Sequence, residues 1–122
     1  MLLDSNLIIY AAMPEHEVLR QFIAEHAPLV SVISKIETLG YHRLQEDERQ
    51  FLEAFFDASE IIAVSEQVVE LSISLRQTKK MSLGDALIGA TAICYDIPLL
   101  TRNVADFHGI GGLKVIDPFT TA

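Results

Sequence analysis

The chain has 122 residues, half of them apolar, and a formal net charge of −8 that results from 9 basic and 17 acidic side chains. This length and composition fit one folded domain over residues 1–122, with a hydrophobic core large enough to need no disulfides. The excess of acidic side chains excludes a protein whose whole surface binds nucleic acid or a membrane, but it leaves room for a local basic strip.

Cys94 is the only cysteine, which excludes a disulfide framework and favours a reducing, cytoplasmic location. It falls inside an apolar helical pattern, so we expect its thiol to be buried as core filler. No uncharged apolar run reaches the ~18 residues of a membrane span, and Asp4 interrupts the N-terminus before a signal-peptide core could form. We therefore expect no membrane association.

The first half of the chain alternates between short apolar runs and stretches with helical spacing. Ser5 or Asn6 is a candidate N-cap for the first helix, and Ala27 and Pro28 end the second. The predicted order is strand 1–4, helix 7–12, helix 15–26, strand 29–33, helix 34–44 and helix 45–56.

The second half continues the alternation, with Ser65 as the cap of a helix that reaches the basic stretch 76–80. The predicted order is strand 60–64, helix 65–80, helix 81–94, strand 97–101, a turn over 102–107, a glycine-rich loop over 109–112 and strand 113–116. Strands that alternate with helices are typical of an α/β protein whose parallel sheet carries helices on both faces.

The helix predicted over 81–94 is apolar or small on nearly every face, which is typical of a buried helix. Its one carboxylate, Asp85, shares a face with Ile88 and Ala92. Asp85 also stands three residues after Ser82, the spacing of a capping box, in which an acid meets free backbone N–H groups. This segment alone leaves a cap and a functional site equally open.

Four acids follow predicted strands or begin the helices beside them: Asp4, Glu37, Asp85 and Asp106. Ligands of open α/β sheets bind at the carboxyl ends of the strands. Two like charges ~4 Å apart repel by about 4 kcal/mol at an effective dielectric near 20, a cost that a divalent cation removes. Oxygen ligands suit Mg²⁺ or Mn²⁺. The four histidines lack the spacing of zinc ligands, and we expect them on the surface.

Four segments in order resemble the PIN-domain endoribonucleases, specifically the VapC-type toxins. They read Leu-Leu-Asp-Ser-Asn at 2–6, Ser-Lys-Ile-Glu at 34–37, Leu-Gly-Asp-Ala-Leu-Ile-Gly-Ala-Thr-Ala at 83–92 and Leu-Leu-Thr-Arg-Asn-Val-Ala-Asp-Phe at 99–107. The resemblance implies an α/β fold with a parallel five-stranded sheet in the order 3-2-1-4-5, and a homodimer. It further implies Mg²⁺- or Mn²⁺-dependent cleavage of RNA by the toxin of a type II toxin-antitoxin pair, inhibited by a small VapB-type antitoxin.

Carried over residue by residue, the resemblance places Asp4, Glu37 and Asp85 on the acidic positions of the family, with Asp4 and Asp85 as direct metal ligands. Asn6 and Thr101 fall where polar neighbours shape that site. Many relatives have an acid where this chain has Asn103, whereas others have Asn there and an acid at the position of Asp106. Asp106 is therefore the candidate for the fourth acid, although Asn103 and Asp106 also have the spacing of a helix cap.

The cations nearest this site in the predicted fold are Lys79, Lys80 and Arg102, which are candidates for contact with the RNA backbone. Basic residues in a last helical turn also serve as partners of the helix dipole, so both readings stay open for the two lysines. An acidic chain with few such residues fits a single-stranded loop better than a duplex.

An apolar stripe at helical spacing predicts core packing, a subunit contact or a groove for an amphipathic segment; it comprises Phe51, Leu52, Phe55 and Phe56. Two other functions stay open. A phosphorelay receiver has this length, acidity and fold class, but it needs a pair of acids after the first strand, where Asp4 stands alone. A non-catalytic PIN-like binding module is the second alternative.

Overall fold

The computed structural model describes residues 1–119. Its elements, in chain order, are β1 (Leu2–Leu3), α1 (Ser5–Ala11), α2 (Glu17–His26), β2 (Val30–Ser31), α3 (Val32–Leu39), α4 (Glu46–Ala58), β3 (Ile61–Ile62), α5 (Glu66–Thr78), α6 (Leu83–Cys94), β4 (Leu99–Leu100), the 3₁₀ helix η1 (Val104–Phe107) and β5 (Val115–Ile116). The alternation of strands and helices confirms the predicted α/β class.

The strands pair in parallel, as two sheets where the sequence predicted one sheet of five strands. One sheet has the order β1-β4-β5, and the other pairs β2 with β3. A single isolated parallel bridge, between Leu2 and Leu29, joins the two sheets. Each of these strands has two residues, and α3 follows β2 directly.

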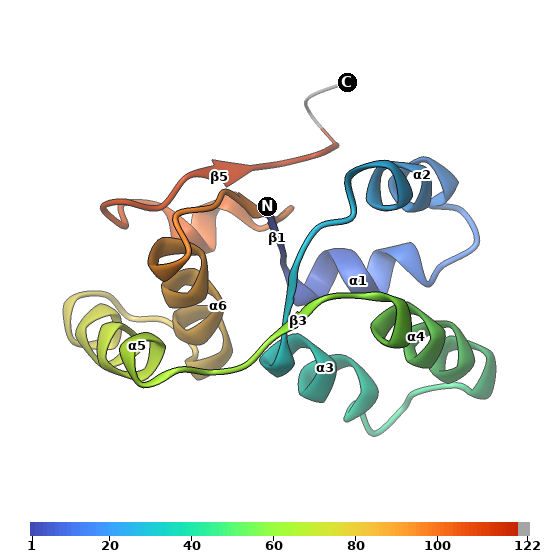
Figure 1. Cartoon of the computed structure of the whole chain (residues 1–122), viewed down its shortest axis with the longest axis horizontal. Helices are drawn as coiled ribbons and strands as arrows, with labels where there is room; N and C mark the ends of the chain where they lie inside the picture. Colours follow the sequence, from blue (N-terminus) through green and yellow to red (C-terminus); the bar gives the residue numbers. More distant parts are fainter. Residues whose placement is uncertain (120–122) are drawn as a thin grey trace.

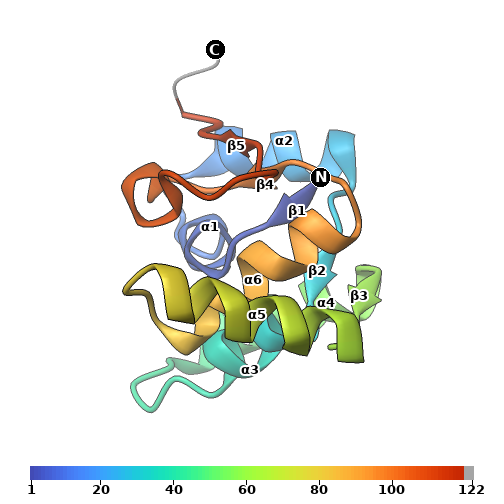
Figure 2. The same ribbon diagram turned by 90° about the vertical axis from the view of Figure 1, so that its left-hand side faces the viewer.

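The two residues of β1 face different parts of the hydrophobic core, because successive strand side chains point to opposite faces. Leu3 packs with Leu7 and Phe56 from α1 and α4, whereas Leu2 packs with Ile88 and Phe107 from α6 and η1. Figures 1 and 2 show the resulting arrangement, with α5 and α6 together on one side of the strands and α2 and α4 on the other. The helices therefore cover both faces.

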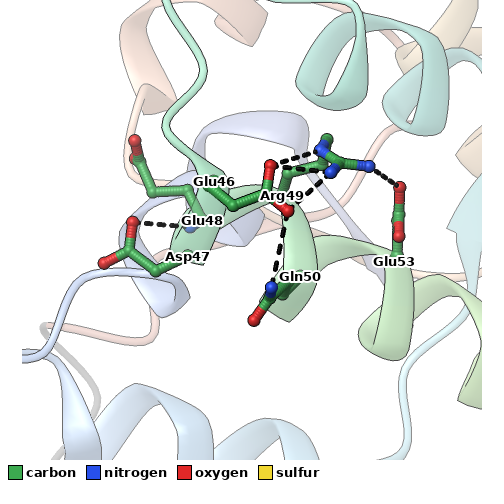
Figure 3. A network of polar contacts seen from close by, with 6 residues as sticks. All are labelled: Glu46, Asp47, Glu48, Arg49, Gln50 and Glu53. Atoms are coloured by element: carbon green, nitrogen blue, oxygen red, sulfur yellow. Dashed lines mark hydrogen bonds and ion pairs between the residues drawn. The ribbon is translucent and has the colours of Figure 1, made fainter.

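The start of α4 is held by local polar contacts rather than by burial (Figure 3). The backbone N–H of Gln45 donates to Glu48 Oε1 at 3.1 Å, which forms one half of a capping box. Arg49 forms ion pairs with Glu46 at 2.6 Å and Glu53 at 2.9 Å. Water screens these exposed pairs, so they order the helix surface and add little stability.

The structure corrects the predicted start of the third helix. Ser31, not Ser34, is the N-cap of α3, and its hydroxyl accepts from the backbone N–H of Ile33 at 3.1 Å. Ser34 lies fully buried one turn into the helix. The prediction was wrong because both serines precede residues with helical spacing. The helix begins directly after β2, so Ser31, the last residue of that strand, becomes the cap.

The predicted burial of Cys94 was also wrong, because its thiol is exposed at the last residue of α6. The apolar pattern of α6 holds for the middle of the helix, from Ala86 to Ala92, but not for its ends: Leu83 is 60% exposed. Within residues 1–119, none of the helices is long and apolar enough to cross a membrane.

Candidate active site

Asp4 lies directly after β1, where the strand turns into α1, and it is the N-cap of that helix. Its Oδ1 accepts from the backbone N–H of Ser5 at 2.8 Å, and its Oδ2 accepts from the Thr101 hydroxyl at 2.7 Å. Thr101 follows β4, the strand beside β1, and its hydroxyl in turn accepts from the backbone N–H of Asn103 at 3.0 Å. Asp4 is buried, so these bonds fix the orientation of its carboxylate.

Ser5 connects Asp4 to the second acid. Its hydroxyl donates to Glu37 Oε1 at 2.7 Å and lies 2.9 Å from the hydroxyl of Ser34. Ser34 and Glu37 are three residues apart on α3, so they share one face of the helix. This face meets α1, and Glu37 is thereby held beside the end of β1 although its residue as a whole is exposed.

Asp85 is the third residue of α6, and its backbone N–H donates to the hydroxyl of the N-cap Ser82 at 3.1 Å. Within the described residues, no bond runs from the Asp85 carboxylate back to the backbone of Ser82, so the reciprocal half of a capping box is missing. The helix is therefore capped by Ser82 alone. A side-chain hydrogen bond with Ser82 also lowers the pKa of Asp85, so this carboxylate lies beside its cap residue.

Gly84 lets α6 begin close to the second acid. A Cβ added at Gly84 would meet the end of the Glu37 side chain, so any other residue here would shift this carboxylate away from the turn. The presence of glycine just before Asp85 is explained by this close approach.

The four acids act on one another electrostatically. Burial raises the pKa of Asp4 to about 6, with further increases from the charges of Asp85 and Glu37, against the opposing hydrogen bond from Thr101. Burial also raises the pKa of Asp85, followed by the charge of Asp106. Repulsion between like charges of this kind requires carboxylates that lie near one another. The structure thus brings all four predicted acids into one region.

Asp106 is exposed in η1, and its backbone N–H donates to the carbonyl of Asn103 at 3.1 Å. Asn103 occupies the N-cap position of η1, but its side chain makes no capping hydrogen bond. The Asn103 side chain therefore does not cap η1, although its position has the spacing of a cap. Of the two residues, Asp106 is the one whose charge acts on Asp85.

The remaining predicted residues lie around the acids in different states. Lys79 donates to the carbonyl of His108 at 2.6 Å and lowers the pKa of Asp85 by its charge, so it lies beside the acids and already has a partner. Lys80 and Asn6 are exposed, and no described hydrogen bond links the Asn6 side chain to the acids. Arg102 packs against aromatic rings.

Within residues 1–119, no three His, Cys, Asp or Glu side chains are grouped closely enough to enclose a metal ion. His26, His42 and His108 are exposed, as expected, and His16 is half-buried beside Tyr10. The donors that the site can offer to a cation are consequently the oxygens of the acids and of the hydroxyls around them.

Sequence reasoning did not identify Ser5, Ser34 and Gly84 as parts of this site. The sequence predicts Ser5 as a candidate N-cap and places Ser34 at the start of a helix, yet their hydroxyls lie around Glu37. The i, i+3 spacing of Ser34 and Glu37 was the signal that they share a face. For Gly84, the signal was a glycine in the first turn of an otherwise apolar helix.

Comparison with known proteins agrees with this architecture. The family model of the PIN domain matches residues 1–112. A toxin-antitoxin complex from Klebsiella pneumoniae contains a chain that is 30% identical, with a TM-score of 0.72 and 96% of each chain covered. No curated protein matches the sequence.

Two further solved structures share the fold at lower identity. VapBC2 from Rickettsia felis, bound to a DNA fragment from its promoter, is 22% identical with a TM-score of 0.79 and covers 94% of this chain and 96% of its own. DNA-bound VapBC from Salmonella typhimurium is 19% identical with a TM-score of 0.81, and the match covers 95% of this chain and 96% of the Salmonella chain. Since the family model spans most of the sequence and the Klebsiella relative matches nearly all of it, this chain belongs to the PIN-domain family, as its resemblance to the VapC-type members predicted.

Proposed function

We propose that this chain is a divalent-metal-dependent endoribonuclease, the toxin of a type II, VapBC-type toxin-antitoxin pair that acts in the cytoplasm, with residues 1–122 forming one nuclease domain. PIN domains are nucleases. The observation that carries the proposal is the gathering of Asp4, Glu37, Asp85 and Asp106, whose charges act on one another. Membership of the PIN family sets aside a phosphorelay receiver, and a non-catalytic PIN-like module remains the alternative to be tested.

We also propose that the two sheets behave as one sheet in the order β3-β2-β1-β4-β5. The support is the parallel bridge between Leu2 and Leu29, together with two backbone bonds across it: Leu3 donates to Leu29 at 2.9 Å, and Leu29 donates to Met1 at 2.9 Å. In this order, β1 and β4 are central strands. Asp4 and Thr101 then follow the central strands at one edge of the sheet.

The donor chemistry of the site fits Mg²⁺ or Mn²⁺, with Asp4 and Asp85 as the residues that would hold the ion. Mg²⁺ usually keeps several waters and takes one or two protein carboxylates, so the site does not need a cage of three acids. When bound, such an ion supplies a water of lowered pKa and neutralises charge on the phosphoryl oxygens of the RNA.

The protein groups around the site position and deprotonate the attacking water. Asp4 cannot rotate, because Ser5 and Thr101 hold its two oxygens. Glu37 or Asp106 accepts the proton of the water. Both are carboxylates whose charges raise the pKa of Asp85, so both lie near it. The Ser5 hydroxyl keeps Glu37 directed toward the end of β1.

The proposed protein partners are an antitoxin and a second copy of the chain. An apolar groove of about 650 Å³ lies between α2 and α4; its lining includes Ile23, Ala24, Phe51, Ala54, Phe55 and Ala58. Such a groove suits the apolar face of a helix from a VapB-type antitoxin. Apolar side chains that a second copy would cover are Ile36, Ile73 and Leu83, which are 63%, 49% and 60% exposed.

The first prediction tests catalysis. Asp85→Asn should reduce the rate of RNA cleavage in Mg²⁺ by more than about 100-fold, because loss of a direct ligand should exceed the 10- to 100-fold typical of residues behind it. The temperature of thermal unfolding should change little, since the Ser82 hydroxyl caps α6 by accepting from the backbone N–H of residue 85, which the substitution keeps. Asp57→Asn, at an exposed position of α4, is the control. Full activity of Asp85→Asn would favour a non-catalytic module.

The second prediction concerns pH. Because the pKa of Asp4 is raised from 3.8 to about 6 in the folded protein, the folded state binds more protons than the unfolded state between these values. The stability that this group contributes is complete below pH 4 and is lost as the pH rises through 6, a total of about 3 kcal/mol.

In chelator, the free energy of unfolding of the wild type should therefore fall over this range relative to Asp4→Asn, and Mg²⁺ should restore part of it at pH 7. Chemical denaturation at several pH values measures both effects. Parallel pH profiles for the two proteins would contradict the raised pKa of Asp4.

The third prediction separates the candidates for the fourth acid. Asp106→Asn should raise the Mg²⁺ concentration needed for half-maximal cleavage by at least about 10-fold, because an amide cannot balance the cation charge. Asn103→Ala should have a smaller effect, since only the backbone of Asn103 is bonded to Thr101. Unchanged metal dependence in Asp106→Asn, with lowered thermal stability, would leave a site of three acids.

The fourth prediction tests the groove. Ala54→Glu places a charge in its apolar lining and should weaken the complex with the product of an adjacent small reading frame by at least about 10-fold. Gln21→Glu adds the same charge at an exposed position of α2 outside the lining and is the control. Calorimetry measures both affinities. Equal binding by the two variants would place the antitoxin elsewhere.

A further inference from the structure

Arg102, which directly follows Thr101, packs on two aromatic rings. Its guanidinium carbon lies 4.4 Å from the ring centre of Phe119 and 5.5 Å from that of Tyr10. Both distances are within the range of cation–π attraction. The rings of Tyr10 and Phe119 also contact each other edge to face, with centres 6.3 Å apart, and His16 adjoins both. The guanidinium is therefore held by the faces of rings that come from α1 and from the segment after β5.

The N–H groups of Arg102 are unused within residues 1–119, because no hydrogen bond or ion pair there involves its side chain. Most other arginines of the chain are committed: Arg20 donates to three backbone carbonyls, Arg49 to two glutamates and Arg76 to the carbonyl of Met81. Arg102 is thus a positioned but unpaired donor. A ring can hold its plane without occupying any of its N–H groups.

We propose that Arg102, stacked on Phe119 and Tyr10, binds a backbone phosphate of single-stranded RNA next to the bond that the acids cleave. The inference rests on the proposed nuclease function and names one contact of its substrate. A planar guanidinium offers two parallel N–H groups to the oxygens of a phosphate, which a lysine ammonium cannot do. Tyr10 and Phe119 are positioning residues, because they act on the RNA through Arg102.

The backbone of Arg102 adjoins the site through Thr101. The Cα atoms of Thr101 and Arg102 are about 3.8 Å apart, as for any consecutive residues, and the Thr101 hydroxyl donates to Asp4. The backbone of Arg102 is therefore one residue from a side chain that contacts Asp4, and its guanidinium extends from there to Tyr10 and Phe119. Lys79 is less suited to this task, because its ammonium already donates to the carbonyl of His108.

The net charge of the chain makes a fixed cation at this place necessary. A chain with a net charge of −8 repels a polyanion over most of its surface, so binding depends on few positive groups. A guanidinium that is ordered before binding loses less side-chain entropy than a free one. Since Phe119 is 37% exposed, the stack remains open to solvent on one side and can be reached by a ligand.

The test measures binding of a labelled, unstructured RNA oligonucleotide in chelator, where cleavage is prevented, over a range of salt concentrations. Arg102→Gln should weaken binding by about 10-fold and lower the slope of log affinity against log salt by about 0.7, the value for one phosphate of a single strand. Arg102→Lys should retain the slope but lose part of the affinity. Arg43→Gln removes an equally exposed cation from the loop between α3 and α4 and should match the wild type.

A double-mutant cycle tests the role of the rings. Phe119→Leu should weaken RNA binding several-fold in the wild type and have no effect in the Arg102→Gln background. An equal effect in both backgrounds would overturn the positioning role of Phe119. If Arg102→Gln lowers thermal stability but leaves RNA binding unchanged, the stack only fastens the segment after β5 to the residue after β4. This result would overturn the proposal.

Two other outcomes separate this inference from the proposed function. Unchanged RNA binding in Arg102→Gln, combined with a weaker complex with an acidic partner protein, would assign the guanidinium to a carboxylate and overturn the phosphate contact. If Asp85→Asn loses cleavage but binds RNA normally, the nuclease function is supported. The effect of Arg102→Gln on RNA binding is then measured separately from cleavage. A wild type that binds no RNA in chelator at any salt concentration would overturn the phosphate contact, whereas cleavage in Mg²⁺ would still support the nuclease.

Discussion

The hydrogen bond from the Thr101 hydroxyl to Asp4 joins two residues that lie 97 positions apart in the chain. It exists because β1 and β4 run in parallel beside each other, with Leu3 opposite Leu100, so that the residue after each strand emerges at the same edge. A buried carboxylate without partners would be costly. With Thr101 and the Ser5 N–H as partners, Asp4 can remain in the core. Asp4 and Thr101 also position their neighbours. The backbone N–H of Asn103 donates to the Thr101 hydroxyl, and Ser5, which follows Asp4, holds Glu37.

The segment after β4 combines three different tasks in consecutive residues. Thr101 holds Asp4, Arg102 stacks on rings from two other elements, and Asn103 fastens the backbone to Thr101 before η1 begins. η1 then carries Asp106 into the range where its charge acts on Asp85. A rigid strand end thus positions groups that face a site from several sides. The burial of Asp4 and Asp85 and the repulsion from the neighbouring acids reduce the stability of the fold.

The sequence was sufficient to predict the α/β class, the region in which the acids gather and the element on which each acid stands. These predictions rest on local rules: acids that follow apolar runs, and helical spacing around Asp85. It was not sufficient where tertiary packing decides. Cys94 lies in an apolar pattern but at a helix end that faces solvent. Ser34 precedes a helical pattern, yet Ser31 begins the helix because β2 ends there. Asn6 is close to Asp4 in sequence, but helix geometry leaves it exposed.

The pairing of β1 with β4 also determines when the site can first exist during protein synthesis. The strand that precedes Asp4 is made before Leu99, Leu100 and Thr101, which come about 95 residues later. At typical rates of translation, this interval is on the order of 5 to 20 s. A nascent chain without β4 offers Asp4 neither the Leu100 carbonyl, to which its backbone N–H donates, nor the Thr101 hydroxyl. A prematurely terminated product consequently lacks the partners that order the Asp4 carboxylate.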